Sequence, residues 1–353
     1  MAKKEVLVKF KTITPLWTGD AWQNSSEIRP SSLIGSLRFW FEVICYFSGV
    51  CKKDDFNEKL GRFEKEVDRK KLKEDFIQKN GNEIKEIIKY LIDKQNIPLP
   101  SIIFGTTNWR SLIEIKKIEF DKSNFKENPS GKILPGKNWY FGTPSYQGKF
   151  SVIFEVEEKV LESIFYPLLT FMDKYGFWGG KWNIGYGRLR VLEVKVDNKT
   201  INNWNKSDFE LFDNSCFSWE TLIKSEKLDF NSKSFKFLKT VVKKKNFYCK
   251  TQRNLGNKIS NIPKKIVFIE LSYSGNKDYK TIIETLLKDK VKIRNCLRPN
   301  NNNEVWTKFR HKLLGEKGEG SKILPFIYEE QEQLKCGFLS IDGLLNLEGR
   351  SDE

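Results

Sequence analysis

Apolar and polar residues alternate at several places in the first half of the chain. Residues 5–14 (EVLVKFKTIT) have the period of two that a half-buried strand requires, and 151–156 (SVIFEV) and 188–196 (RLRVLEVKV) repeat it. Residues 101–106 (SIIFGT) and 111–120 (SLIEIKKIEF) are also strand-like, because they are rich in Ile and Phe. The pattern therefore predicts a sheet of several strands.

Two segments between these strands have helical spacing. Ser31 or Ser32 caps a helix, and its apolar side consists of Leu33, Leu37, Trp40 and Ile44. A short helix runs from Pro167 to Tyr175, with proline in its first turn. The resulting order is strand, helix, strand, strand, helix, strand. This is the split βαβ pattern of a ferredoxin-like sheet with helices on one face.

The chain of 353 residues exceeds what one hydrophobic core usually supports, so we expect two domains. Residues 1–197 form the N-terminal ferredoxin-like domain, which contains a charged, solvated helical insertion at about 52–95. The Asn- and Asp-rich residues 197–216 mark the boundary.

Residues 198–353 are expected to form a second ferredoxin-like domain with basic insertions. Its strand candidates are 265–273 (KIVFIELSY) and 336–341 (CGFLSI), and 279–289 (YKTIIETLLKD) has helical spacing. The fold class that we predict is α+β, with two tandem ferredoxin-like domains that carry helical insertions.

The charge composition of the chain indicates what kind of partner it binds. The chain holds 62 Lys and Arg against 46 Asp and Glu, a net charge of +16 that is shared evenly between residues 1–200 and 201–353. Such a field attracts a polyanion, and nucleic acid is a better candidate than an anionic membrane. The alternative is compositional bias, since Lys and Asn are both abundant.

Few residues of this chain suit metal or imidazole chemistry. The six cysteines are scattered without a CxxC pair, so we expect reduced, mostly buried thiols, with no metal and no cofactor. His311 is the only histidine, which excludes mechanisms that need two imidazoles. No apolar run is long enough to span a membrane, and the N-terminus lacks a secretory signal pattern. We expect a cytoplasmic protein.

Residues 176–190 (GFWGGKWNIGYGRLR) combine five glycines with rings and cations. Gly180 and Gly185 have the spacing of a phosphate-binding P-loop, but Tyr186 replaces its lysine. A dinucleotide-binding loop follows a strand and precedes a helix, whereas here the order is reversed. Two interpretations stay open: a structural turn, or RNA contact, for which the candidate residues are Lys181, Trp182, Tyr186 and Arg188.

A second basic stretch lies in the C-terminal half. Residues 231–269 contain eleven Lys or Arg and no acidic residue, with aromatic rings among them, and 288–312 add eight cations. A solvated face is the simple explanation of such a run, but cations interleaved with rings favour nucleic-acid contact. The candidate contacts are Lys243, Lys244, Lys245, Arg294, Arg298 and Arg310.

Three segments together resemble a known family. TPLWTGD (14–20), IRPSSLIGSLRFWFE (28–42) and the G-x-G-R loop at 185–188 resemble the RAMP superfamily of CRISPR-associated RNA-binding proteins. Within it they are similar to the first RAMP subunit of type III-B (Cmr) effector complexes. Asp20, Ile34 and Glu42 depart from the family pattern. From the 28–42 segment we therefore expect only Arg29 and Arg38 to contact phosphates.

The resemblance implies two RRM-like RAMP domains in a non-catalytic subunit. Such a subunit binds single-stranded guide or target RNA near the 3′ end of the guide, beside other RAMP subunits. Two alternatives stay open. One is a guide-RNA processing endoribonuclease that uses His311 as its acid or base. The other is a structural bridge that contacts only protein partners.

Overall fold

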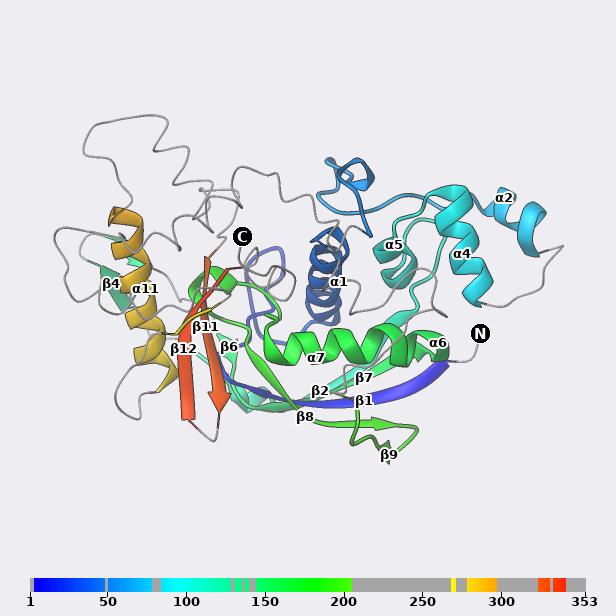
Figure 1. Cartoon of the computed structure of the whole chain (residues 1–353). Coiled ribbons are helices and arrows are strands. Elements are labelled where there is room, and N and C mark those ends of the chain that lie inside the picture. The colour runs from blue at the N-terminus through cyan, green and yellow to red at the C-terminus, as the bar shows by residue number, and fades with distance from the viewer. Residues whose placement is uncertain are drawn as a thin grey trace, which may run out of the picture.

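The first half of the chain forms a five-stranded antiparallel sheet with two helices on one side of it (Figure 1). The computed structural model describes residues 3–47, 50–77, 84–127, 131–134, 137–139, 144–204, 268–270, 278–296, 323–330 and 333–340. The elements of this layer are β1 (Lys3–Thr12), α1 (Pro30–Phe47), β2 (Ile113–Phe120), β7 (Lys149–Glu157), α7 (Tyr166–Lys174), β8 (Leu189–Val196) and β9 (Lys199–Thr200).

The strand order β2-β7-β1-β8-β9 matches the ferredoxin-like arrangement. Strand β1 pairs with β7 on one side and with β8 on the other, so each helix-containing connection crosses over one strand. The predicted order of strands and helices is confirmed, and so is the mixed α+β class. Along β1, Val6, Val8 and Phe10 are buried, as a period of two requires.

The helices bury the apolar side that their spacing predicts. Leu33, Leu37, Trp40 and Ile44 of α1 belong to the core above the sheet, and α7 adds Leu168 and Leu169. Short elements connect these layers: α6 (Glu158–Val160), η4 (Leu161–Phe165), η5 (Trp182–Ile184), η3 (Lys122–Asn124), β3 (Phe125–Lys126), β4 (Gly131–Leu134), β5 (Lys137–Trp139) and β6 (Ser145–Tyr146).

One predicted strand is wrong. Residues 101–106 lie mostly in a short helix, α5 (Leu99–Phe104), which begins after Pro98 and ends at Gly105 with φ +85°. Every residue of α5 is buried, including the polar Ser101, so the segment has no exposed positions that would reveal its period.

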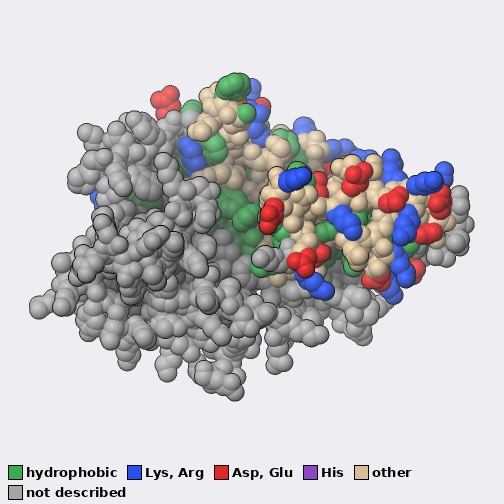
Figure 2. Space-filling model, turned by 90° about the horizontal axis from the view of Figure 1, so that it is seen from above, with side chains coloured by type: hydrophobic (Ala, Val, Ile, Leu, Met, Phe, Trp, Pro, Cys, Tyr) green, Lys and Arg blue, Asp and Glu red, His purple; other side chains and the backbone are tan. Residues whose placement is uncertain are grey.

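The insertion at 52–95 contains η1 (Lys53–Asp55), α2 (Arg69–Leu72), η2 (Lys73–Ile77) and α4 (Ile84–Gln95). It is not solvated throughout, because Phe63, Val67, Ile87 and Leu91 are buried in the same core as the sheet. Over α2 and α4, Lys and Arg side chains alternate with Asp and Glu (Figure 2). The insertion therefore shows a surface of mixed charge on that face.

The described part of the second half is a three-stranded antiparallel sheet with one helix. It consists of β10 (Phe268–Glu270), α11 (Tyr279–Cys296), β11 (Ile323–Glu330) and β12 (Gln333–Ser340), in the strand order β10-β12-β11. The predicted strands at 265–273 and 336–341 overlap β10 and β12, and the predicted helix at 279–289 begins where α11 begins. Strand β11 was not predicted. A complete second ferredoxin-like domain stays a prediction.

The second sheet packs against the first half. Leu324, Phe326 and Leu339 belong to the core that also contains the five-stranded sheet. No helix among the described residues is long and apolar enough to cross a bilayer. In the same part of the chain, no three His, Cys, Asp or Glu side chains gather into a set that could hold a metal ion.

Candidate nucleic-acid interface

The three segments that carry the family resemblance meet in the structure. In the glycine stretch (residues 176–190), the Gly180 N–H donates to the Trp17 carbonyl at 2.8 Å and the Gly187 N–H donates to the Pro15 carbonyl at 2.8 Å. The Gly179 N–H donates to Ser36 Oγ of α1 at 2.9 Å. The loop after β1, the first turns of α1 and the glycine stretch are therefore one hydrogen-bonded unit.

At two positions of this unit, the backbone conformation requires glycine. Gly179 and Gly187 have φ of +69° and +89°, in the region that L side chains rarely adopt. A Cβ at Gly179 would also overlap the carbonyl oxygen of Trp17, and one at Gly187 would overlap that of Trp178. The glycine stretch is thus a close-packed structural turn.

Arg188, a predicted RNA contact, is an interior residue. Its side chain is 1% exposed, and its guanidinium donates to the carbonyls of Asp173, Lys174 and Gly176 at the end of α7. Its Nε also donates to the carbonyl of Ile327 in β11, at 3.3 Å. Burial lowers the pKa of Arg188 to about 9, so the group is still charged at pH 7. The prediction for Arg188 is corrected: its donors are used within the fold.

Arg38, also predicted to contact phosphates, ties α1 to the insertion. Its Nε donates to Glu42 at 2.8 Å, and its other nitrogens donate to Glu64 at 3.2 Å and to the Gly105 carbonyl at 3.0 Å. Burial raises the pKa of Glu42, although Arg38 opposes the shift. The prediction for Arg38 is corrected because its guanidinium is buried and paired.

The two aromatic residues that were predicted to contact RNA, Tyr186 and Trp182, also pack within the fold. Tyr186 is 3% exposed, and burial raises the pKa of its hydroxyl. Tyr186 therefore offers no ring for base stacking, which corrects the prediction. Trp182 is half-buried, and its ring centroid lies 5.0 Å from Phe39, 5.9 Å from Trp40 and 6.2 Å from Phe177. Its main role is aromatic packing between the glycine stretch and α1.

Of the predicted cations whose side chains the structure describes, Arg29 and Lys181 reach the surface. The Arg29 guanidinium pairs with Glu27 at 3.1 Å and with Asp20 at 3.5 Å, and 29% of the side chain is exposed. The Lys181 ammonium lies 4.7 Å from the ring centroid of Trp17, and partial burial lowers its pKa. Trp22, on the same loop, is 84% exposed. Cations and rings thus gather beside the N-terminus of α1.

The other predicted contacts cannot be placed. Lys243, Lys244, Lys245, Arg298 and Arg310 lie outside the described residues, as does His311. Arg294 lies in the last turns of α11, and its side chain is also outside what the structure describes.

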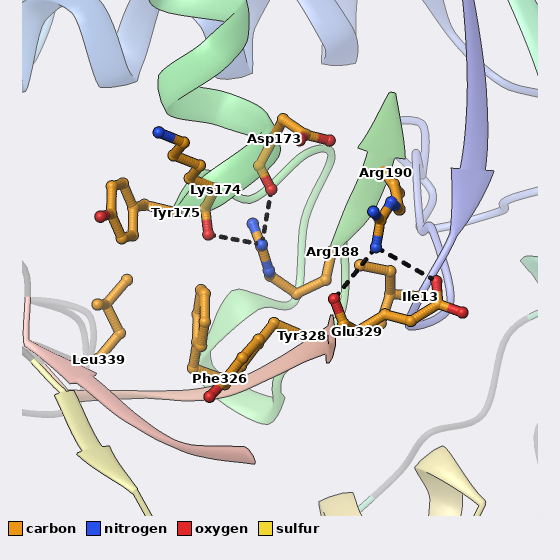
Figure 3. A pocket seen from close by; sticks show the side chains of 10 residues that line it. All are labelled: Ile13, Asp173, Lys174, Tyr175, Arg188, Arg190, Phe326, Tyr328, Glu329 and Leu339. Carbon is orange, nitrogen blue, oxygen red and sulfur yellow. Dashed lines mark hydrogen bonds and ion pairs between the residues drawn. The ribbon is translucent and has the colours of Figure 1, made fainter. Parts of the chain in front are cut away.

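A cavity that the sequence did not indicate lies between the two halves (Figure 3). It measures about 410 Å³ and is lined by the end of α7, the start of β8 and the hairpin of β11 and β12. Arg190, at its edge, donates to the Glu329 carbonyl at 3.1 Å. Arg190 stands two residues after Arg188, and both side chains line the cavity, as the period of two of an extended segment allows. This spacing was the only signal of the cavity in the sequence.

Two solved structures are similar to this chain over most of its length. A crystal structure of Cmr1 from Pyrococcus furiosus in its apo form is 15% identical, and the alignment covers 96% of this chain and 88% of that one, with a TM-score of 0.40. A chain in the cryo-EM structure of the type III-B Cmr-beta complex bound to cognate target RNA is 12% identical, with coverages of 96% and 94% and a TM-score of 0.40. No curated protein sequence matches.

A protein-family model shows which family the chain belongs to. The model of the RAMP superfamily matches residues 9–190, which include the end of β1, the loop after it, α1 and the whole glycine stretch. This is just over half of the chain, and it contains the hydrogen-bonded unit described above. The chain belongs to the RAMP superfamily.

Proposed function

We propose that the chain is a non-catalytic RNA-binding subunit of a type III-B CRISPR effector complex in the cytoplasm. In this role it binds single-stranded guide or target RNA near the 3′ end of the guide, beside other RAMP subunits of the complex. The observation that carries the proposal is the RAMP family match over residues 9–190. The resemblance of 14–20 and 28–42 to the first Cmr RAMP subunit supports the choice of complex.

The charge of the chain supports an RNA partner. A net charge of +16 attracts a polyanion, and the eleven cations of 231–269 have no acidic residue between them. The insertion at 52–95 carries 13 basic and 11 acidic residues, so it contributes little to this field. We therefore assign the RNA contact to the glycine-stretch side and the C-terminal basic segments, rather than to the insertion.

The geometry beside α1 supports single-stranded rather than duplex RNA. Lys181 lies over Trp17, Arg29 is partly exposed, and Trp22 projects from the same loop. Rings of this kind stack on bases that are not paired, and nearby cations neutralise the phosphates. The helix N-terminus adds backbone N–H groups that favour negative charge.

A salt titration of RNA binding tests the proposal. If about six cations contact phosphates of one strand, the logarithm of the affinity should fall against the logarithm of salt with a slope near −4. Neutralising Lys243, Lys244 and Lys245 to Ala should reduce the slope by about 2 and weaken binding. The matched control neutralises three exposed lysines of the insertion, Lys70, Lys71 and Lys73, and should leave the slope unchanged.

Two outcomes would contradict the proposal. If the purified full chain does not bind short single-stranded RNA at low salt, the structural-bridge alternative is favoured. If both triple variants lower the slope equally, the attraction is non-specific and the basic segment is not a binding surface. Crosslinking to photoreactive RNA, with the same variants, gives an independent measurement.

A further inference from the structure

The cavity between the two halves has walls that are held in place by polar contacts. Arg188 joins three carbonyls at the end of α7 to the Ile327 carbonyl of β11. On the opposite edge, the Glu329 carboxylate accepts a hydrogen bond from Lys11 Nζ at 3.2 Å. The backbone carbonyl of Glu329 accepts a second one from the Arg190 guanidinium at 3.1 Å. The α7 end and the β11–β12 hairpin are therefore fixed on both sides of the opening, so the cavity is preorganised.

Aromatic rings form much of the lining. Figure 3 shows Tyr175, from the end of α7, across the cavity from Phe326 and Tyr328 of the hairpin. Phe326 and Tyr328 lie 5.9 Å apart with their planes tilted by 37°. Tyr175 and Tyr328 are half-buried, so each presents part of its ring to the cavity. A planar, apolar group fits between such walls.

The charges around the opening favour an anion. Lys174 is exposed at the end of α7, and the Arg190 side chain is 46% exposed and also pairs with the Glu329 carboxylate at 4.0 Å. The two carboxylates of the lining are occupied, since Asp173 accepts a hydrogen bond from the Val191 N–H at 2.6 Å and Glu329 pairs with Lys11. The cavity therefore lacks free acidic ligands for a metal ion, while cations stand at its mouth.

A volume of about 410 Å³ lies within the range of roughly 300 to 1,000 Å³ that ligand pockets have. An inorganic anion would not need the aromatic walls, and an apolar ligand would not need the cations. A nucleobase with its phosphate uses both, because the base stacks between rings and the phosphate meets Lys174 and Arg190.

We propose that this cavity binds one unstacked nucleobase of a single RNA strand, with Tyr175 and Tyr328 beside the base and Lys174 and Arg190 on its phosphate. The inference rests on the proposed RNA-binding function and gives it a specific site. It also places one point of the RNA path at the junction of the two halves, away from the surface beside the N-terminus of α1.

Photocrosslinking of the full chain tests the site. Short RNAs that each carry one 4-thiouridine at a different position are bound, irradiated and mapped by mass spectrometry. We expect one position to crosslink to the peptides that contain Tyr175 or Tyr328. Tyr328→Leu keeps apolar volume but removes the ring, so it should lower that crosslink by about fivefold or more. The matched control is Tyr46→Leu, an exposed ring on α1, which should not change it.

A second variant tests the site even if Tyr328→Leu does not fold correctly. Lys174→Ala changes an exposed side chain, so the fold should be retained, which thermal unfolding would verify. It should reduce the salt slope of RNA binding by about 0.7, as expected for one lost phosphate contact. Lys199→Ala, exposed on β9, is its control and should leave the slope unchanged.

The outcomes separate this inference from the proposed function. If RNA binds but crosslinks map elsewhere, and both Tyr328→Leu and Lys174→Ala behave as wild type, the cavity proposal is overturned and RNA binding stands. If no RNA binds, both proposals fail. A further experiment adds uridine monophosphate to the full chain and follows the NMR signals of the nucleotide. Binding of this nucleotide at the cavity without RNA binding would assign the site to free nucleotides and overturn the RNA assignment.

Discussion

The guanidinium of Arg188 lies over the ring of Phe326, with its Cζ 4.4 Å from the ring centroid. Arg188 lies near the end of the glycine stretch, whereas Phe326 belongs to β11 far along the chain. The contact thus joins the two halves of the molecule at the same place where the guanidinium satisfies the carbonyls that α7 leaves unpaired at its C-terminus. A cation is also favoured there by the helix dipole.

Arg188→Lys should lower the free energy of unfolding by about 2 to 4 kcal/mol, because one ammonium cannot reach all the carbonyls that the planar guanidinium serves. Chemical denaturation of the full chain would measure the loss. The control is Arg190→Lys, whose side chain is 46% exposed, and for which a change below about 1 kcal/mol is expected. Equal, small effects in the two variants would contradict the structural role of Arg188.

The same substitution at two glycines should have opposite effects. Gly187→Ala should destabilise by about 2 kcal/mol or more, because φ is +89° and the added Cβ overlaps the Trp178 carbonyl. Gly35→Ala, in the middle of α1, should stabilise by about 0.5 to 1 kcal/mol, because an added Cβ meets nothing within 4 Å. Thermal unfolding of both variants measures the contrast, and a loss of stability in both would refute it.

Much of the first half could be predicted from its sequence, because one face of each strand is buried. The alternation in 5–14, 151–156 and 188–196 located β1, β7 and β8 to within a few residues. Strand β11 was missed because its middle, from Leu324 to Ile327, is buried on both faces and shows no alternation. The helix α5 was predicted as a strand for the same reason, because all of its residues are buried and show no period.

The site was harder to predict, because the pattern of residue types in the glycine stretch does not distinguish a surface from an interior. Arg188 and Tyr186 were expected to contact RNA because they stand among glycines and rings. The second sheet covers this stretch, since Phe326 lies against Arg188, and Pro325 lies against Gly185, the residue before Tyr186. These contacts come from residues far apart in sequence, which local patterning cannot report.

The stability of the chain should depend on pH through Asp173. Burial raises the pKa of this carboxyl above its ordinary value of 3.8, so the folded state holds the proton to higher pH than the unfolded state does. Its contribution to stability is therefore present below about pH 4 and is lost as the pH rises through the raised pKa. Asp173→Asn lacks this titration and retains an oxygen for the Val191 N–H.

We therefore expect Asp173→Asn to gain stability relative to wild type as the pH rises from 4 to 7. Urea denaturation of both proteins at several pH values measures the difference. A difference that stays constant over this range would show that Asp173 does not titrate between the two states. Asp121→Asn is the control: hydrogen bonds lower the pKa of that exposed carboxyl below its ordinary value of 3.8, so its titration lies below about pH 4 and this variant should gain no stability relative to wild type between pH 4 and 7.

The absence of catalysis is the last prediction. His311 is the only side chain in the sequence whose ordinary pKa lies near neutrality, so a cleavage mechanism by general acid–base catalysis would depend on it. We expect the full chain to leave a labelled guide-precursor RNA intact over hours, and His311→Ala to give the same products on a denaturing gel. Cleavage by the wild type that disappears in His311→Ala would instead establish the endoribonuclease. Because RNA affinity is measured in parallel, a loss of products through weaker binding can be told apart from a loss of chemistry: only the second leaves the dissociation constant unchanged.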